Sequence, residues 1–397
     1  MQIGFDISSL YVPQSGVGTY TANLLQHLRF QAGPRILPLA PRLPNINPLS
    51  VYGSDWLNGF LGITHRNPNG HHASRPASYD DISLSGRPMN KTLWLQTVVP
   101  WQVARLGVDI CHFTNQVGPL WIPCPMILTI HDMSLWLFPE YHHYRRLLAM
   151  RPLIPLVAHR AAAIITISHS AKQDIVRILG IPAHKIHVIY EAPASCFKPL
   201  AAGPALDSIR ESYRLPERFL LCVGTIEPRK NLVRLLEAFA QLRRSDARFR
   251  TYVLIFVGQR GWKDEAVFAA VERLGLSQVV SFLGHVPTNV LVGLYNLADA
   301  LAFPSLYEGF GLPVIEAMAC GTPVITSRNN ALAEIAGDAA ELVDPTHSGD
   351  IFEGLRRVLT DSARQEELRT QGFVRAAQFS WLTAATQTRE LYTQIVS

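Results

Sequence analysis

Short apolar runs alternate with amphipathic stretches along most of the chain. Runs such as Met126–Ile130, Phe219–Val223 and Ala300–Pro304 contain almost no polar residue, as expected of parallel strands buried on both faces. Between them, apolar residues recur with helical spacing, as in Leu232–Leu242. This alternation of strand and helix predicts an α/β protein built from doubly wound parallel sheets.

The alternation runs through the chain twice. One series begins with the strand-like run IGFDIS at residues 3–8, and a second begins with FLLCV at Phe219–Val223. Pro and Gly residues gather between residues 193 and 216, a composition typical of an interdomain connection. We therefore predict two Rossmann-like domains that face each other across a cleft. Their expected bounds are residues 1–195 and 217–378, joined by a linker at 196–216.

One segment of the first half breaks the alternation. Residues 41–88 are rich in Pro, Asn, Gly, Ser, His and Arg and show little apolar periodicity. They predict a long surface loop inserted into the first domain, which is either functional or disordered.

Composition narrows the class of protein. With 397 residues, 48% hydrophobic and 17% charged, the chain has enough apolar surface to exclude global disorder. It has no run of about 18 apolar residues free of charge, and its start lacks the regions of a signal peptide, so we expect a cytoplasmic protein. The five cysteines form no C-x-x-C pair, and no zinc-ligand spacing predicts a metal site.

The net charge of +5 indicates which partners to expect. It favours anionic ligands or a peripheral contact with the anionic inner face of a membrane. Most basic residues are dispersed along the chain, so we expect no nucleic-acid partner.

The segment from residue 303 to 327 is the richest in chemistry. Glu308 follows a predicted strand, and Gly309 and Gly311 permit positive φ, so backbone N–H groups of this loop can converge on an anion. Pro313 fits the first turn of a helix, which places Glu316 in that turn, near the positive end of the helix dipole. Two glutamates around such a turn suit a nucleotide-sugar, because N–H groups bind phosphate and carboxylates accept from hydroxyls. The alternative is that Glu308 caps a helix and Glu316 pairs with a surface cation.

A second group of residues follows the strand FLLCV. In VGTIEPRKNL, Arg229 and Lys230 lie at the carboxyl end of the predicted sheet. Two adjacent cations there suit a pyrophosphate. In the alternative, they cap the carbonyls of a surface turn.

The first half contributes two weaker signals. SGVGTY places Gly16 and Gly18 in a loop before a helix that begins near Thr19, and TIHD places His131 just past a strand. The glycine loop lacks the third glycine and the acid of a dinucleotide site. His131 is a candidate site residue because it is expected to face the phosphate-binding loops, although a structural histidine is the alternative.

Together these motifs resemble the family 4 retaining glycosyltransferases of the GT-B fold. The E-x7-E pattern of that family appears as Glu308 and Glu316, its basic motif as EPRKN, its glycine loop as SGVGTY and its histidine motif as HD. The segment FSWLTAATQTRELY resembles the family's C-terminal helix, which implies that residues 379–397 cross back onto the first domain.

The resemblance also implies roles. Glu316 would bind the ribose, Glu308 the donor sugar, and Arg229 with Lys230 the diphosphate. Many members carry Arg at the position of Thr225, so EPRKN members are expected to use Arg229 instead. The implied catalytic residues are His131, Glu308, Arg229 and Lys230. The implied donor-binding residues are Gly16, Gly18, Thr225, Arg229, Lys230, Glu308, Gly309, Phe310, Gly311, Leu312 and Glu316.

The implied reaction is transfer of a hexose without a metal or other cofactor, with the nucleotide-sugar as substrate. EPRKN members resemble bacterial mannosyltransferases, so we expect mannose to move from GDP-mannose to a glycan or lipid-linked acceptor in surface polysaccharide or lipopolysaccharide synthesis. A UDP-sugar or dTDP-rhamnose is the alternative donor. Other classes left open are a glycoside hydrolase with paired glutamates and a non-catalytic nucleotide-sugar binding protein.

Overall fold

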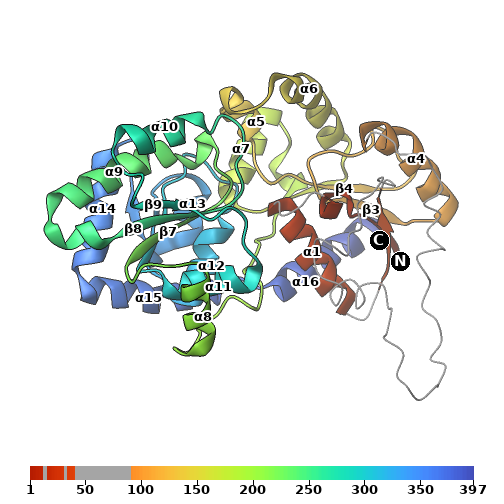
Figure 1. Cartoon of the computed structure of the whole chain (residues 1–397). Helices are drawn as coiled ribbons and strands as arrows, with labels where there is room; N and C mark the ends of the chain where they lie inside the picture. The colour runs from red at the N-terminus through yellow and green to blue at the C-terminus, as the bar shows by residue number, and fades with distance from the viewer. Residues whose placement is uncertain (12–15, 31–33, 41–90) are drawn as a thin grey trace, which may run out of the picture.

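The computed structural model describes residues 1–11, 16–30, 34–40 and 91–397. The predicted insertion at residues 41–88 lies outside the described residues. Two six-stranded sheets, in which all strand pairs are parallel, form two domains that lie side by side (Figure 1). The predicted fold class of two doubly wound α/β domains is confirmed.

The first domain, on the right of Figure 1, has the strand order β2-β1-β3-β4-β5-β6. Helices α1 and α16 pack on one face of this sheet, and α4, α6 and α7 pack on the other. Its strands are β1 (Gln2–Asp6), β2 (Arg35–Leu39), β3 (Ile110–Phe113), β4 (Met126–Thr129), β5 (Ala163–Thr166) and β6 (Ile186–Val188). Its helices are α1 (Gly16–Phe30), α4 (Lys91–Leu106), α5 (Ser134–Leu137), α6 (Tyr144–Arg160) and α7 (His169–Leu179), together with α16 (Trp381–Val396).

The second domain has the strand order β12-β11-β10-β7-β8-β9. Its strands are β7 (Phe219–Val223), β8 (Val253–Val257), β9 (Val280–Phe282), β10 (Ala300–Phe303), β11 (Val324–Ser327) and β12 (Glu341–Val343). Its helices are α8 (Pro204–Ser212), α9 (Leu232–Ser245), α10 (Glu265–Arg273), α11 (Thr288–Leu297), α12 (Leu312–Cys320), α13 (Asn330–Ala336), α14 (Ser348–Thr360) and α15 (Ser362–Ala376).

The segment predicted as a linker contains a helix. Pro204 starts α8, where a missing N–H costs nothing, and Leu206 is buried. Ile209 of α8 packs so closely on α11 that a Cβ added at Gly293 would lie 2.4 Å from its Cδ1 atom. The second half of the segment from 196 to 216 therefore packs against the second domain.

The last helix joins the end of the chain to its beginning. Helix α16 lies beside α1, and the Tyr20 and Trp381 rings are 6.0 Å apart. Tyr392 is fully buried, and its hydroxyl lies 2.6 Å from Nδ1 of His112 on β3. The second domain is thus held to the first by two chain crossings, the segment before β7 and the segment before α16.

A carboxylate of the second domain caps a helix of the first. Glu334 on α13 accepts hydrogen bonds from the backbone N–H groups of His169 and Ser170, each at 2.8 Å, and from the Tyr190 hydroxyl at 3.0 Å. A carboxylate suits this position because the first N–H groups of α7 lack partners within the helix. The capping contact fixes one end of the domain boundary.

Candidate active site

The loop after β10 brings Glu308 to the boundary between the domains. Gly311, at φ 111°, precedes α12, and Pro313 lies in the first turn of that helix. Gly309 does not have a positive φ, so that part of the sequence prediction is wrong. Its small size serves close packing instead, because an added Cβ would lie 2.0 Å from the carbonyl oxygen of His131 in the first domain.

Glu308 is shared by two cations. Its Oε1 accepts a hydrogen bond from Lys230 Nζ at 2.6 Å, and its Oε2 accepts from Arg229 Nη1 at 2.7 Å. Arg229 also donates to Glu227 Oε1 at 2.6 Å. Burial alone would raise the pKa of Glu308, but the two cations outweigh it and lower this pKa to about 2. The carboxylate is therefore ionised at neutral pH.

The turn after β7 places both cations. Gly224, at φ 139°, turns the chain, and the short 3-10 helix Pro228–Lys230 follows. Asn231 then adopts φ 61° and donates to the Pro304 carbonyl at 3.0 Å, which ties this turn to the end of β10. Lys230 Nζ lies 4.8 Å from the centre of the Phe303 ring. Neighbouring strands of one sheet thus deliver the cations and the carboxylate to the same point.

Glu316 lies deeper than the sequence predicts. Helix α12 starts at Leu312, so Glu316 is in its second turn, and the helix dipole does not govern its charge. Burial raises the pKa of Glu316 to about 7, and the charge of Glu191 adds to this rise. The Tyr295 hydroxyl donates a hydrogen bond to Glu316 Oε2 at 3.0 Å, and this bond lowers the pKa of Glu316 and so offsets part of the rise. Glu316 is a carboxyl group poised to change charge near neutral pH.

His131 faces this region from the first domain. Its Nε2 lies 2.9 Å from the Thr114 carbonyl oxygen, which can only accept, so Nε2 carries a proton. Its Nδ1 lies 3.6 Å from Oε1 of Glu191, and the Tyr20 ring meets the imidazole edge to face at 4.8 Å. The sequence prediction missed Glu191, although it follows β6 at the same carboxyl edge of the sheet.

The structure also places three further residues that the sequence predicts to bind the donor. Thr225 is exposed, and its methyl group packs towards Gly261. Phe310 is buried beside Phe379, at a ring distance of 5.6 Å. Leu312 is the first residue of α12 and packs against the core.

The prediction that Gly16 and Gly18 lie in a loop is wrong. Gly16 and Gly18 lie in the first turn of α1, which begins three residues before the predicted Thr19, and neither has a positive φ. They remain at the N-terminus of a helix, the end that carries the positive pole of the helix dipole.

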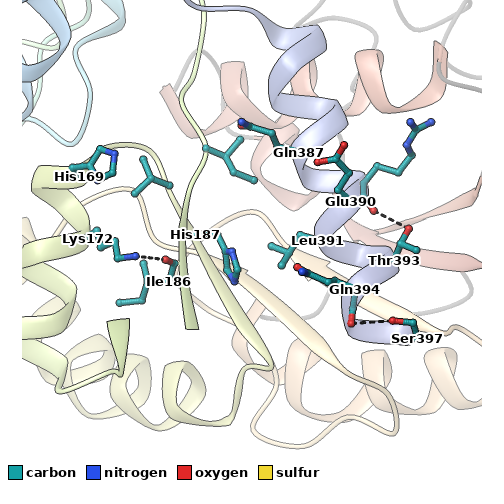
Figure 2. Close-up of a pocket in the computed structure, with 13 residues that line it drawn as sticks. His169, Lys172, Ile186, His187, Gln387, Glu390, Leu391, Thr393, Gln394 and Ser397 are labelled. Atoms are coloured by element: carbon teal, nitrogen blue, oxygen red, sulfur yellow. Dashed lines mark hydrogen bonds between the residues drawn. The ribbon is translucent and has the colours of Figure 1, made fainter. Parts of the chain in front are cut away.

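A cavity of 900 Å³ lies apart from these residues (Figure 2). It is lined by α7, β6 and α16, with Lys172, His187 and Gln394 among its side chains. None of the predicted site residues lines it.

Comparison with known proteins decides the family. The sequence model of "Glycosyl transferases group 1" matches residues 207–375, and that of "Glycosyltransferase Family 4" matches residues 14–192. O-antigen chain mannosyltransferase B of Escherichia coli is 36% identical over 67% of this chain and 69% of its own length. The chain belongs to the family 4 glycosyltransferases. The resemblance of its motifs to that family is therefore confirmed.

Two further comparisons extend the picture. The serotype-specific mannosyltransferase WbdA of Escherichia coli is 34% identical over 57% of this glycosyltransferase, but the match spans only 28% of that longer protein. The solved structure of Anabaena Alr3699/HepE in complex with UDP-glucose matches the fold with a TM-score of 0.72 at 18% identity, over 99% of this chain and 100% of that one.

The pKa of Glu316 predicts a pH effect on stability. Because the folded glycosyltransferase keeps this proton to about pH 7 and the unfolded chain releases it near the ordinary 4.5, the free energy of unfolding falls as pH rises between these values. In Glu316→Gln, which cannot titrate, the decrease in the free energy of unfolding across this pH range should be smaller by up to about 3 kcal/mol. Urea unfolding across the window measures it, with exposed Glu366→Gln as control. An unchanged pH slope in Glu316→Gln would contradict the assignment.

Close packing at Gly309 predicts a second effect. In Gly309→Ala, the Cβ meets the His131 carbonyl, so the loop or the domain contact must shift. We expect a loss of stability of about 1–3 kcal/mol and at least tenfold slower sugar transfer. Gly349→Ala is the matched control, because nothing lies within 4 Å of its added Cβ. Thermal unfolding and turnover of both variants test this, and equal behaviour would refute the role of the contact.

Proposed function

We propose that this glycosyltransferase moves mannose from GDP-mannose to a glycan or lipid-linked acceptor in surface polysaccharide synthesis. The observation that carries the proposal is the pair of partly buried cations, Arg229 and Lys230, held against Glu308 at the edge of the second sheet. Relatives named as O-antigen mannosyltransferases support the sugar and the pathway class.

Each charged residue has a proposed part in donor binding. Arg229 and Lys230 neutralise the diphosphate, helped by backbone N–H groups from Gly309 to Leu312. Glu308 then accepts hydrogen bonds from hydroxyls of the donor sugar, and Glu316 accepts from the ribose. The proximity of Glu308 to both cations supports this division, because sugar and diphosphate are joined in the donor.

The proposed chemistry retains the configuration of the sugar. The acceptor hydroxyl attacks C1 from the side of the leaving group, the bond from C1 to the phosphate oxygen breaks, and the departing diphosphate takes the acceptor proton. Arg229 and Lys230 stabilise the charge that develops on the diphosphate. His131 lies near the transferring sugar in this scheme. The reaction as proposed uses no metal or other cofactor.

The proposed acceptor implies a location for the enzyme. A lipid-linked acceptor would bring it to the inner face of a membrane from the cytoplasm, as a peripheral protein. Among the residues that the structure describes, no helix is both long enough and apolar enough to span a bilayer.

The donor base and the reaction class are open to direct test. A UDP-sugar is the alternative donor, since UDP-glucose is bound in Alr3699/HepE, and dTDP-rhamnose is another. Thermal shifts with GDP, UDP, dTDP and ADP rank the bases, because ligand binding stabilises by mass action. A glycoside hydrolase would release sugar from a nitrophenyl glycoside without nucleotide. A non-catalytic sugar-nucleotide binder would take the donor without turnover.

Removal of the Lys230 charge tests the diphosphate assignment. Lys230→Ala should weaken GDP binding by about 1.5–3 kcal/mol, the contribution of one charge-assisted hydrogen bond. Calorimetry measures this against Lys198→Ala, which removes an exposed lysine of the chain. Unchanged affinity in Lys230→Ala would remove this lysine from the nucleotide site.

Glu308 is tested by its isosteric amide. Glu308→Gln should lower turnover about 10²- to 10³-fold, because the sugar loses its charged acceptor. GDP should still bind, since both cations remain. Initial rates with donor and acceptor measure this, with Glu353→Gln from a surface ion pair as control. Near-normal turnover in Glu308→Gln would exclude the role.

A further inference from the structure

Helices α4 and α6 and the chain between them form one outer surface of the first domain. Both helices pack on the same face of the first sheet, at the upper outer side of this domain in Figure 1. The Gln96 side chain on α4 donates to the Gly118 carbonyl at 3.2 Å and accepts from the Leu120 N–H at 2.8 Å. Arg160 on α6 donates to the Leu120 carbonyl. We call this surface the α4–α6 face.

Large apolar side chains project from this face. On α6, Tyr144, Leu148 and Leu156 recur at multiples of four residues and are 59%, 72% and 56% exposed, whereas Ile154 and Val157 on the opposite side are fully buried. The other exposed apolar residues of the face are Leu93 and Trp101 on α4 and Trp121 between the helices. Soluble surfaces seldom gather so many apolar side chains without a partner.

Only positive charge accompanies them. Neither α4, nor α6, nor the segment 114–125 contains an Asp or Glu. Arg105 lies over the Trp101 ring at 5.3 Å, and Arg145 lies over the Tyr144 ring at 5.8 Å. The basic residues of the two helices are Lys91, Arg105, Arg145, Arg146, Arg151 and Arg160. In the described part of the chain, none of them is paired with an acid.

A pocket of 190 Å³ opens between the two helices. Lys91 and Arg146 lie in its wall, and Leu95 and Met150 provide an apolar lining. Gln116, which also lines it, has a buried Oε1 atom without a hydrogen-bond partner. Cations beside an apolar lining match a phosphate that carries a hydrocarbon chain.

We propose that the α4–α6 face docks on a bilayer that contains anionic phospholipid. Trp and Tyr side chains enter the interface, Leu side chains reach the acyl region, and the arginines meet lipid phosphates. A bilayer fits better than a protein partner because all charges have one sign and accompany a broad apolar surface. The inference rests on the proposed use of a lipid-linked acceptor, and docking is measured without donor or acceptor.

Vesicle sedimentation of the full chain tests the docking. We expect binding to vesicles of phosphatidylcholine with phosphatidylglycerol to exceed binding to phosphatidylcholine alone by at least about tenfold, and to weaken with salt. Trp101→Ser combined with Trp121→Ser should lower the partition coefficient about tenfold. Val374→Ser combined with Leu382→Ser, at exposed apolar sites in α15 and α16, should not.

A charge comparison completes the test. Arg105→Gln, Arg145→Gln and Arg146→Gln together should abolish the preference for anionic vesicles, whereas Arg244→Gln, Arg250→Gln and Arg356→Gln, with the same net charge, should keep it. Thermal unfolding controls for folding, and transfer to a water-soluble acceptor should stay unchanged in all variants.

Equal binding to both vesicle types, no binding, or equal losses in face and control variants would overturn the proposal. Transfer failing in every variant would count against the proposed function instead.

Discussion

Two cations, Arg229 and Lys230, share one buried carboxylate, Glu308, and the rest of the site depends on this arrangement. Removing charges from water is costly, and here each buried carboxylate and each partly buried cation meets an opposite charge at hydrogen-bond distance. Glu227 completes the group on the far side of Arg229, so two carboxylates balance two cations. Removal of one member would leave an uncompensated charge, at a cost of about 3–5 kcal/mol.

The same group of charges joins the loops and the two domains. Arg229 donates to the Tyr307 carbonyl at 2.6 Å, so it fixes the backbone that carries Glu308. The Tyr307 hydroxyl donates to Asp174 at 2.9 Å and accepts from the Met133 N–H at 3.2 Å, both in the first domain. The placement of the ionic residues and the contact between the domains are thus parts of one structure. A movement that opens the boundary must also loosen the loop around Glu308.

Patterns of apolar residues predicted the elements whose sequences are unambiguous. The strand predicted at Phe219–Val223 has the observed bounds, and Met126–Ile130 and Ala300–Pro304 each exceed the observed strand by one residue, because buried parallel strands give a strong local signal. The short strand β12 was missed because it is only partly buried, and α8 was missed among prolines and glycines. Gly309 and Glu316 show the other limit. Gly309 packs against His131, which is distant in sequence, and burial within the folded chain raises the pKa of Glu316, so no local pattern reveals either feature.

In the proposed function, the cations that hold Glu308 also bind the diphosphate of the donor. A crystal structure of the enzyme with bound GDP tests it most directly. We expect Lys230 Nζ and the Arg229 guanidinium to lie within hydrogen-bond distance of phosphate oxygens, Glu308 to have moved away from Lys230, and the ribose hydroxyls to donate to Glu316. A diphosphate bound elsewhere, with both cations still on Glu308, would contradict it.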